Sequence, residues 1–257
     1  MIPPTIHFIW IQDKNPFGFL ELTSIKSVLK NTPYSIILHT NLRQDQTSEY
    51  NPYTLLCDRF TIDVQPYSCE VEGMLMKPSV ITDFLRVKIL QQYGGIYSDL
   101  DMIWFNPLPV DLTSLRLLGC WQNQSYKNVG TYMIACEKGY DFSEVNKKFL
   151  EHIETYKQNK KTQIKGKSLK EHLIFYREIV SYVRDHADLI LKQKYFEKNR
   201  WKQIWRFLTN QIPEEKIVFK DICGIHICGS GLFGKYKCDT RELLTKHKGL
   251  AKLIAEF

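Results

Sequence analysis

Short apolar runs alternate with segments of helical periodicity in the first part of the chain. The run from Pro3 to Ile11 is bounded by prolines and by the Asp-Lys-Asn-Pro sequence at 13–16, which is typical of a buried parallel strand. Residues 24–29 fit a short helix that stops at an Asn-Thr-Pro sequence, and residues 35–39 fit a second strand. This strand, helix, strand rhythm predicts an α/β sheet.

The clearest helix pattern begins at Pro78. Apolar residues recur at intervals of three and four as far as Leu90, with Asp83 placed in the first turn, and Gly94 and Gly95 follow the last of them. After these glycines the pattern changes to period two over residues 96–104. That period places Tyr97, Asp99 and Asp101 on one face of a strand or extended turn.

The second half is richer in helix. Residues 115–121 and 131–135 fit short strands, and residues 143 to about 208 are helical in pattern, with a capping box at 168–171. Residues 216–219 and 224–228 return to strand. We therefore predict a single domain over 1–257, in which residues 143–212 form a helical accessory subdomain that helps to build an acceptor site.

Composition identifies a folded protein with a locally basic surface. Apolar residues make up 44% and charged residues 25%, which argues against a disordered or fibrous chain. The net charge of +7 comes from Lys-rich stretches at 147–202 and 235–252. These stretches fit either a solvated face or peripheral contact with an anionic membrane. We expect no nucleic-acid partner, because no reading motif accompanies the charge. The sequence does not indicate an oligomeric state.

The cysteines and the hydropathy pattern bear on location. Seven dispersed cysteines, without a secretory signal peptide before them, favour reduced thiols over a disulfide framework. No run reaches the roughly 18 consecutive apolar residues that cross a bilayer. We therefore expect a cytoplasmic protein.

The pair Asp99 and Asp101 is the strongest candidate for chemistry. Two neighbouring carboxylates repel each other unless a cation lies between them, and oxygen ligands suit Mg²⁺ or Mn²⁺. Such an ion could stabilise the charge on a departing diphosphate. An EF-hand is excluded, because Ile103 and Trp104 stand where that loop needs a ligand and a glycine. A surface turn is the structural alternative.

The context of this pair resembles a known family. Residues 82–101 contain Thr-Asp-Phe-Leu-Arg, then Tyr-Gly-Gly-Ile-Tyr, then Asp-Leu-Asp, and residues 2–10 read Ile-Pro-Pro-Thr-Ile-His-Phe-Ile-Trp. Both segments resemble the DXD-motif glycosyltransferases, which are related to the glucosyltransferase domains of the large clostridial toxins. The resemblance implies a GT-A type nucleotide-sugar-binding fold, a Rossmann-like mixed sheet flanked by helices, here with the helical insertion.

The resemblance also implies roles for individual residues. Asp101 would coordinate the metal, Asp99 would contact the donor ribose and assist the metal, and Asp83 and Arg86 would hold the donor sugar hydroxyls as part of the catalytic set. Trp10 would flank the base, with Ile9 and Tyr97 also among the donor-binding residues. Structural alternatives are a helix-end charge for Asp83, a surface ion pair for Arg86 and a core position for Trp10.

A third metal ligand is expected near the C-terminus. The family has a segment of the type H-x-W-x-x-S-W there, and this chain keeps His226 but lacks both tryptophans. A histidine ligand would favour Mn²⁺ over Mg²⁺. A second departure is Thr131, where the family often has asparagine, and Asn128 is a possible substitute.

The glycine-rich stretch 229–236 nearly matches a P-loop, but Tyr236 replaces the hydroxyl residue that would hold Mg²⁺, so a nucleoside triphosphatase is rejected. Gly229 and Lys235 could still contact a diphosphate. Cys223, His226 and the cysteines at 228 and 238 do not have zinc-finger spacing.

These observations predict transfer of a hexose from a UDP- or GDP-sugar to a hydroxyl of a glycan, lipid or protein acceptor, and the resemblance implies retention of anomeric configuration. Two alternatives stay open. A nucleotidyltransferase would release pyrophosphate, whereas a non-catalytic carbohydrate-binding or lipid-surface protein would turn over no donor.

Overall fold

The computed structural model describes residues 1–12, 16–47, 49–67, 70–71, 74–123, 127–160, 169–196 and 222–227. Several sequence predictions lie wholly or partly outside these ranges: the helical pattern and accessory subdomain at 197–212, the capping box that begins at residue 168, the strand at 216–219, and Gly229 and Lys235 as diphosphate contacts.

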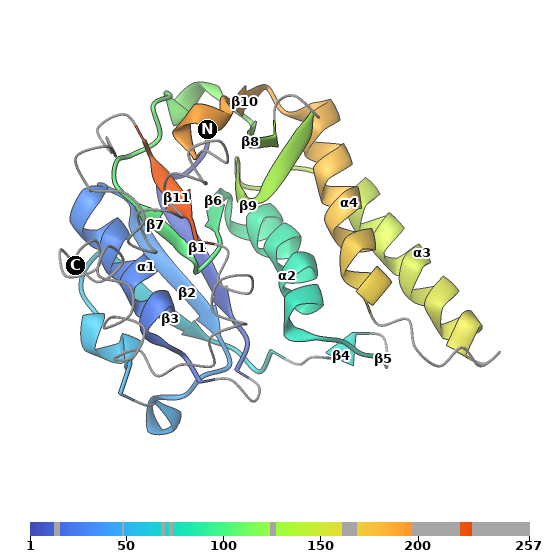
Figure 1. Ribbon diagram of the computed structural model, residues 1–257, viewed down its shortest axis with the longest axis horizontal. Coiled ribbons are helices and arrows are strands. Elements are labelled where there is room, and N and C mark those ends of the chain that lie inside the picture. Colours follow the sequence, from blue (N-terminus) through green and yellow to red (C-terminus); the bar gives the residue numbers. More distant parts are fainter. Residues whose placement is uncertain are drawn as a thin grey trace, which may run out of the picture.

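A seven-stranded mixed sheet forms the centre of the molecule, in the order β10-β8-β9-β6-β1-β2-β3 (Figure 1). Strands β3, β2, β1 and β6 run parallel to one another, whereas β9 runs antiparallel to both β6 and β8, and β10 is parallel to β8. The strands are β1 (Thr5–Trp10), β2 (Ser35–Thr40), β3 (Phe60–Val64), β6 (Gly95–Ser98), β8 (Leu117–Asn123), β9 (Asn128–Cys136) and β10 (Leu189–Leu191).

Helices cover both faces of this sheet. Figure 1 shows α1 (Phe19–Asn31) on one side and α2 (Pro78–Tyr93), α3 (Ser143–Lys160) and α4 (Leu169–His186) on the other. Each face has its own apolar core. Ile6 and Phe8 of β1 pack in the cluster that contains Ile25 of α1, while Ile9 packs in the cluster that contains Phe84 of α2. The alternation of β1 between these two cores is the reason for its continuous apolar run.

Shorter elements complete the fold. Strands β7 (Met102–Trp104) and β11 (Gly224–His226) form an antiparallel pair, and β4 (Glu70–Val71) and β5 (Met74–Leu75) form another. The 3-10 helices are η1 (Gln44–Gln46), η2 (Pro52–Leu55), η3 (Leu112–Ser114) and η4 (Gln193–Tyr195). Polar side chains of α1 fix β7 in place, because Ser24 Oγ donates to Met102 O at 2.6 Å and Asn31 Nδ2 donates to Trp104 O at 2.7 Å.

The α/β class and the helix from Pro78 are confirmed, and the first helix is longer than residues 24–29. The prediction of helix throughout 143–208 is wrong at Leu189–Leu191, which forms the edge strand β10. A three-residue apolar run has no distinguishing period, so its pairing with β8 decided its conformation. Within the described residues, no helix has the length and apolar character that a bilayer crossing requires.

Candidate active site

Two glycines connect the helix and strand that carry most of the candidate residues. Gly94 has φ of 69° and Gly95 has φ of 94°, a region that side-chain-bearing residues rarely adopt. A Cβ atom on Gly94 would lie 2.5 Å from Lys138 N, and one on Gly95 would lie 2.6 Å from Thr5 O. Gly94 and Gly95 therefore allow a tight reversal of the chain, and α2 packs beside β6 as a result.

The two aspartates lie in a turn between β6 and β7, and not within a strand. Asp99 N donates to Tyr132 O at 2.9 Å, which extends the pairing of β6 with β9, and Met102 N donates to Asp99 O at 3.2 Å, which closes the turn. The side chains of Asp99 and Asp101 are 25% and 23% exposed. The turn thus presents both carboxylates at the carboxyl end of β6, the edge where open α/β sheets bind ligands.

Strand β11 brings His226 to this turn. It pairs with β7 so that His226 lies opposite Met102, and Ile227 N donates to Asp101 O at 2.8 Å (Figure 1). Gly224 permits the approach, since a Cβ atom there would lie 2.8 Å from Ile103 O. The imidazole of His226 stacks on the ring of Tyr132, with 4.8 Å between centroids.

Asp99, Asp101 and His226 converge on one point. His226 Nε2 lies 2.9 Å from Asp101 Oδ1 and 3.5 Å from Asp99 Oδ2. One ligand atom from each residue lies within 4.8 Å of the others. Among the described residues, no other group of three or more acidic, histidine or cysteine side chains comes together closely enough to hold an ion. Two carboxylates and one imidazole suit a divalent ion such as Mn²⁺. The structure thus brings together the three residues predicted as metal ligands.

Arg86 lies directly behind the aspartates. Its side chain is 6% exposed, and its Nη2 lies 2.8 Å from Asp83 Oδ1 and 3.8 Å from Asp99 Oδ1. Its Nη1 donates to Thr131 O at 2.7 Å, and its guanidinium lies 4.4 Å from the ring centre of Tyr97. Burial alone would lower the pKa of Arg86. Tyr97, Asp83 and Asp99 raise that pKa above its ordinary value. The site therefore contains a permanent buried cation.

Two alternative interpretations of these residues are wrong. Asp83 is not in the first turn of α2, which begins at Pro78 and has no acidic residue there, so it does not serve as a helix-end charge. Arg86 is buried and is not a surface ion pair.

Tyr97 connects the cation to the metal-ligand cluster. Its hydroxyl donates to Asp99 Oδ1 at 2.6 Å. Burial raises the pKa of Tyr97 well above its ordinary value, so the phenol keeps its proton and remains a donor. Burial also raises the pKa of Asp99, an effect that Arg86 opposes. The carboxylate of Asp99 is thus held from one side by Tyr97 and Arg86, with its other oxygen toward His226.

The remaining predicted donor-binding residues lie at the end of β1. Trp10 is partly buried, its Nε1 donates to Gln12 Oε1 at 2.9 Å, and its ring packs edge-on against Phe17. Ile9 is buried in the core on the α2 side. Because His7 of β1 pairs with Tyr97 of β6, Trp10 and the aspartate turn extend from the same edge of the sheet.

The structure adds residues that sequence reasoning missed. Tyr132 stacks on His226, and the carbonyl of Thr131 accepts from Arg86, although neither contact has a local sequence signal. Glu21 at the start of α1 lies near the cluster as well. Burial raises the pKa of Glu21 to about 7, and the negative charge of Asp101 contributes to that rise.

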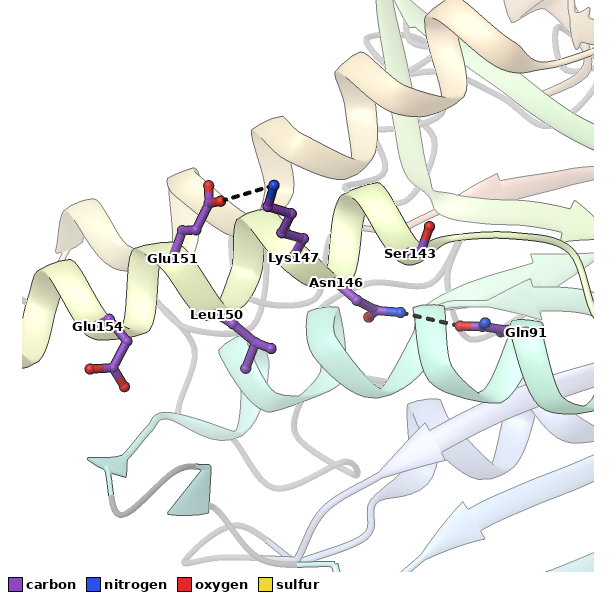
Figure 2. A pocket seen from close by; sticks show the side chains of 7 residues that line it. All are labelled: Gln91, Ser143, Asn146, Lys147, Leu150, Glu151 and Glu154. Atoms are coloured by element: carbon purple, nitrogen blue, oxygen red, sulfur yellow. Dashed lines mark hydrogen bonds and ion pairs between the residues drawn. The ribbon is translucent and has the colours of Figure 1, made fainter.

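A separate hollow of about 630 Å³ lies between α2 and α3, away from these residues (Figure 2). Gln91 and Asn146 hydrogen-bond across it, and Lys147 pairs with Glu151 along α3 at 3.9 Å. Leu150 and Glu154 project beside them. None of the predicted site residues lines this hollow, and its charges pair within one helix, so it is not the candidate active site.

Comparisons with known proteins agree with the DXD interpretation. Residues 19–118 match a family model described as glycosyltransferase sugar-binding region containing DXD motif. No curated protein matches the sequence.

Several solved structures resemble the chain. The apo-form glycosyltransferase GlyE of Streptococcus pneumoniae TIGR4 is 12% identical, over 98% of this chain and 64% of GlyE, with a TM-score of 0.53. PaToxG glycosyltransferase is 17% identical over 70% of both chains, with a TM-score of 0.44. The galactosyltransferase LgtC, in complex with donor and acceptor sugar analogs, is 14% identical over 94% of this chain and 99% of LgtC, with a TM-score of 0.44.

This chain spans less than two thirds of the length of GlyE, whose similarity supports the predicted GT-A type fold. The aspartate turn lies inside the matched family region. Residues 19–118 therefore match a glycosyltransferase sugar-binding region, and Asp99-Leu100-Asp101 is the DXD sequence within that match.

Proposed function

We propose that this protein transfers a hexose from a UDP- or GDP-sugar to an acceptor hydroxyl, with retention of configuration, and that Asp99, Asp101 and His226 bind the divalent ion that the reaction needs. The observation that supports this most is the convergence of the three side chains at one point, with the buried cation Arg86 behind them.

Each residue of the site has a role in this proposal. A divalent ion bound by the three side chains would act as a Lewis acid toward the departing diphosphate. Tyr97 and Arg86 fix the orientation of Asp99, which reduces the reorganisation needed when donor binds. Asp83 is paired with Arg86 at 2.8 Å, an arrangement that suits contact with sugar hydroxyls better than proton abstraction.

The test is release of free nucleoside diphosphate from a panel of UDP- and GDP-sugars with Mn²⁺, with and without a chelator. Asp101→Asn keeps the size of the side chain and removes its charge, so we expect loss of about 10²- to 10³-fold in rate. Asp58→Asn is the matched control, because Asp58 is exposed and precedes β3, and its rate should equal that of the native chain.

The products distinguish the alternatives. Nucleoside diphosphate that appears only with metal and native Asp101 supports the proposal. Pyrophosphate from a nucleoside triphosphate and a sugar phosphate would indicate a nucleotidyltransferase instead. Absence of turnover and of donor binding across the panel would contradict the proposal and favour a non-catalytic binding protein.

A further inference from the structure

Strand β7, which follows the aspartate turn, pairs with β11 along one of its two edges. In this antiparallel pair, Ile227 N of the β11 segment donates to Asp101 O at 2.8 Å. The backbone groups of an antiparallel strand face its partner at every second residue. Since those of Asp101 face β11, the N–H and C=O groups of Met102 and Trp104 face the opposite edge.

Helix α1 binds this opposite edge of β7 with its side chains. Ser24 Oγ donates to Met102 O at 2.6 Å. At Trp104, the backbone N–H donates to Ser27 Oγ at 2.9 Å and the carbonyl accepts from Asn31 Nδ2 at 2.7 Å. Positions 24, 27 and 31 follow the helical period, so the three side chains form one polar stripe of α1. This stripe takes the place of a neighbouring strand.

The two serine contacts have similar structural value. Their four residues each have 0% of their surface exposed: Ser24, Ser27, Met102 and Trp104. A buried backbone group that loses its partner lowers the stability of the protein. Removal of either hydroxyl should therefore destabilise the fold to a similar extent. The two serines differ in the strand residue that each one holds.

Met102, the residue held by Ser24, is connected to all three proposed metal ligands. It follows Asp101 directly, and its N–H donates to Asp99 O at 3.2 Å, which closes the aspartate turn. It also lies opposite His226 in the pairing of β7 with β11. A shift of the Met102 backbone would therefore change the positions of the three ligands relative to one another.

Trp104, the residue held by Ser27, lies farther along β7 and is fixed at several points. Its backbone has two contacts with α1, so it keeps the bond to Asn31 when Ser27 is removed. Its buried indole Nε1 also donates to Ser98 Oγ at 3.1 Å. Loss of the Ser27 hydroxyl should therefore move the metal ligands much less than loss of the Ser24 hydroxyl.

We propose that Ser24 is a positioning residue of the active site. Through the Met102 carbonyl, it holds the three metal-ligating side chains at the separation that binds a divalent ion. This proposal rests on the proposed function, because it requires that these side chains bind the ion. It adds a residue of α1, which lies outside the motif that contains the aspartates.

The test compares Ser24→Ala with its matched control, Ser27→Ala. Each variant loses one buried hydroxyl and one hydrogen bond to β7, so both should show similar shifts in the midpoint of urea denaturation. In Ser24→Ala, Mn²⁺ affinity should fall about 10-fold, because residues that support metal ligands typically contribute about 10- to 100-fold. In Ser27→Ala it should stay close to native. Titration followed by the electron paramagnetic resonance signal of free Mn²⁺ measures both affinities.

A second readout follows the arrangement of ligands around the bound ion. The electron paramagnetic resonance spectrum of bound Mn²⁺, recorded at saturation, should change in Ser24→Ala and remain native in Ser27→Ala. A contribution of Ser24 to overall stability alone would not change this spectrum. Ser24→Cys keeps a weak donor at the same position and should retain part of the affinity. If Ser24→Ala does not fold, Ser24→Cys and Ser27→Cys provide the same comparison.

Two results would overturn the proposal. The first is native Mn²⁺ affinity with a native spectrum in folded Ser24→Ala. The second is equal weakening in the two alanine variants, because the effect would then follow the loss of any hydrogen bond to β7 and not the connection of Met102 to the ligands.

Failure of the proposed function gives different results. If the native chain binds Mn²⁺ in a manner that depends on Ser24 but releases no nucleoside diphosphate, the positioning role stands and the proposed function fails. If the native chain does not bind Mn²⁺, the three side chains are not a metal site, and both proposals are overturned.

Discussion

Two regions of this molecule place histidine beside aspartate, and they differ in nearly every other respect. In the first, His226, Asp99 and Asp101 meet at the carboxyl end of β6, with side chains 18–25% exposed. In the second, His7 of β1 lies 2.9 Å from His39 of β2, and His39 lies 2.9 Å from Asp63 of β3. Both pairs of atoms are close enough for strong hydrogen bonds.

The second region, the buried histidine pair, is part of the packing of the sheet. His7 and His39 are 1% and 0% exposed, and the ring of Tyr93 lies against both. Burial and the neighbouring His39 lower the pKa of His7 to about 3, and burial lowers that of His39. These imidazoles are therefore neutral at physiological pH, and their single aspartate does not converge with them on one point.

The comparison shows that residue type does not decide function here. In the buried pair, one carboxylate contacts one imidazole, which in turn contacts the second imidazole. In the active-site cluster, two carboxylates and one imidazole surround a shared position that solvent can reach. The first arrangement stabilises the fold, and the second can bind an ion. Four predictions follow from this difference, given from the largest expected effect to the smallest.

The largest difference concerns metal binding. Asp101→Asn should weaken Mn²⁺ binding about 100-fold or more, because it removes a charged ligand and even the loss of a supporting residue costs about 10- to 100-fold, whereas Asp63→Asn should leave Mn²⁺ affinity unchanged. Titration followed by the electron paramagnetic resonance signal of free Mn²⁺ measures both. Equal weakening in the two variants would contradict the assignment of the ion to the β6 end.

Stability should show the reverse pattern. His39→Leu leaves His7 and Asp63 without their shared partner, so we expect the free energy of unfolding to fall by about 2 to 3 kcal/mol. His226→Leu, at a partly exposed position, should change it by less than about 1 kcal/mol. Chemical denaturation of both variants provides the comparison, and a larger loss in His226→Leu would show that the roles are reversed.

Stability should also depend on pH through the buried pair. Below the ordinary pKa of 6.5, unfolded histidines bind protons that His7 does not bind in the folded state until about pH 3. The free energy of unfolding should therefore decrease as pH falls from 6.5, by up to about 1.4 kcal/mol per pH unit for each buried histidine. Urea denaturation between pH 7 and pH 4.5 measures this slope, and His7→Gln should reduce it. An equal slope in that variant would assign the effect to other groups.

The smallest effect is expected from the ring that supports His226. Tyr132→Leu removes the stacked ring at 4.8 Å, and such contacts contribute about 0.5 to 1.5 kcal/mol. Mn²⁺ affinity should therefore fall by up to about tenfold, while Tyr132→Phe keeps the ring and should retain native affinity. Weakening in the phenylalanine variant would point to the hydroxyl of Tyr132 and away from the ring.

Local pattern predicted part of the fold well. Helix α2 has a regular apolar period between Pro78 and the two glycines, and β1 and β2 are apolar runs with clear ends. Strands β3 and β10 were missed, because the first contains the polar Asp63 and the second has three residues, and pairing with neighbouring strands determined both. For Asp99 and Asp101 the sequence allowed either a strand or an extended turn, and the structure has the turn.

The sequence also predicted only some of the residues of the candidate site. Asp83, Arg86, Tyr97, Asp99 and Asp101 lie within twenty residues, and the motif predicted them together. The contacts of Tyr132 with His226 and of the Thr131 carbonyl with Arg86 were not predicted, since they join residues from distant elements that have no common spacing. Asn128 was considered only as a substitute for a missing asparagine at Thr131.

The sequence by itself determined the continuous unit of α2, the two glycines, β6 and the aspartate turn, because its conformation depends on helix periodicity and on two residues that tolerate positive φ. The resemblance had indicated His226 as the third ligand, but only the tertiary structure decided that His226 meets the aspartates and that His7 and His39 are buried. Strand β11 must pair with β7 to deliver His226, and β1 must pair with β2 to enclose His7 and His39. Burial and convergence depend on contacts between distant segments, and the spacing of residues along the chain does not encode them.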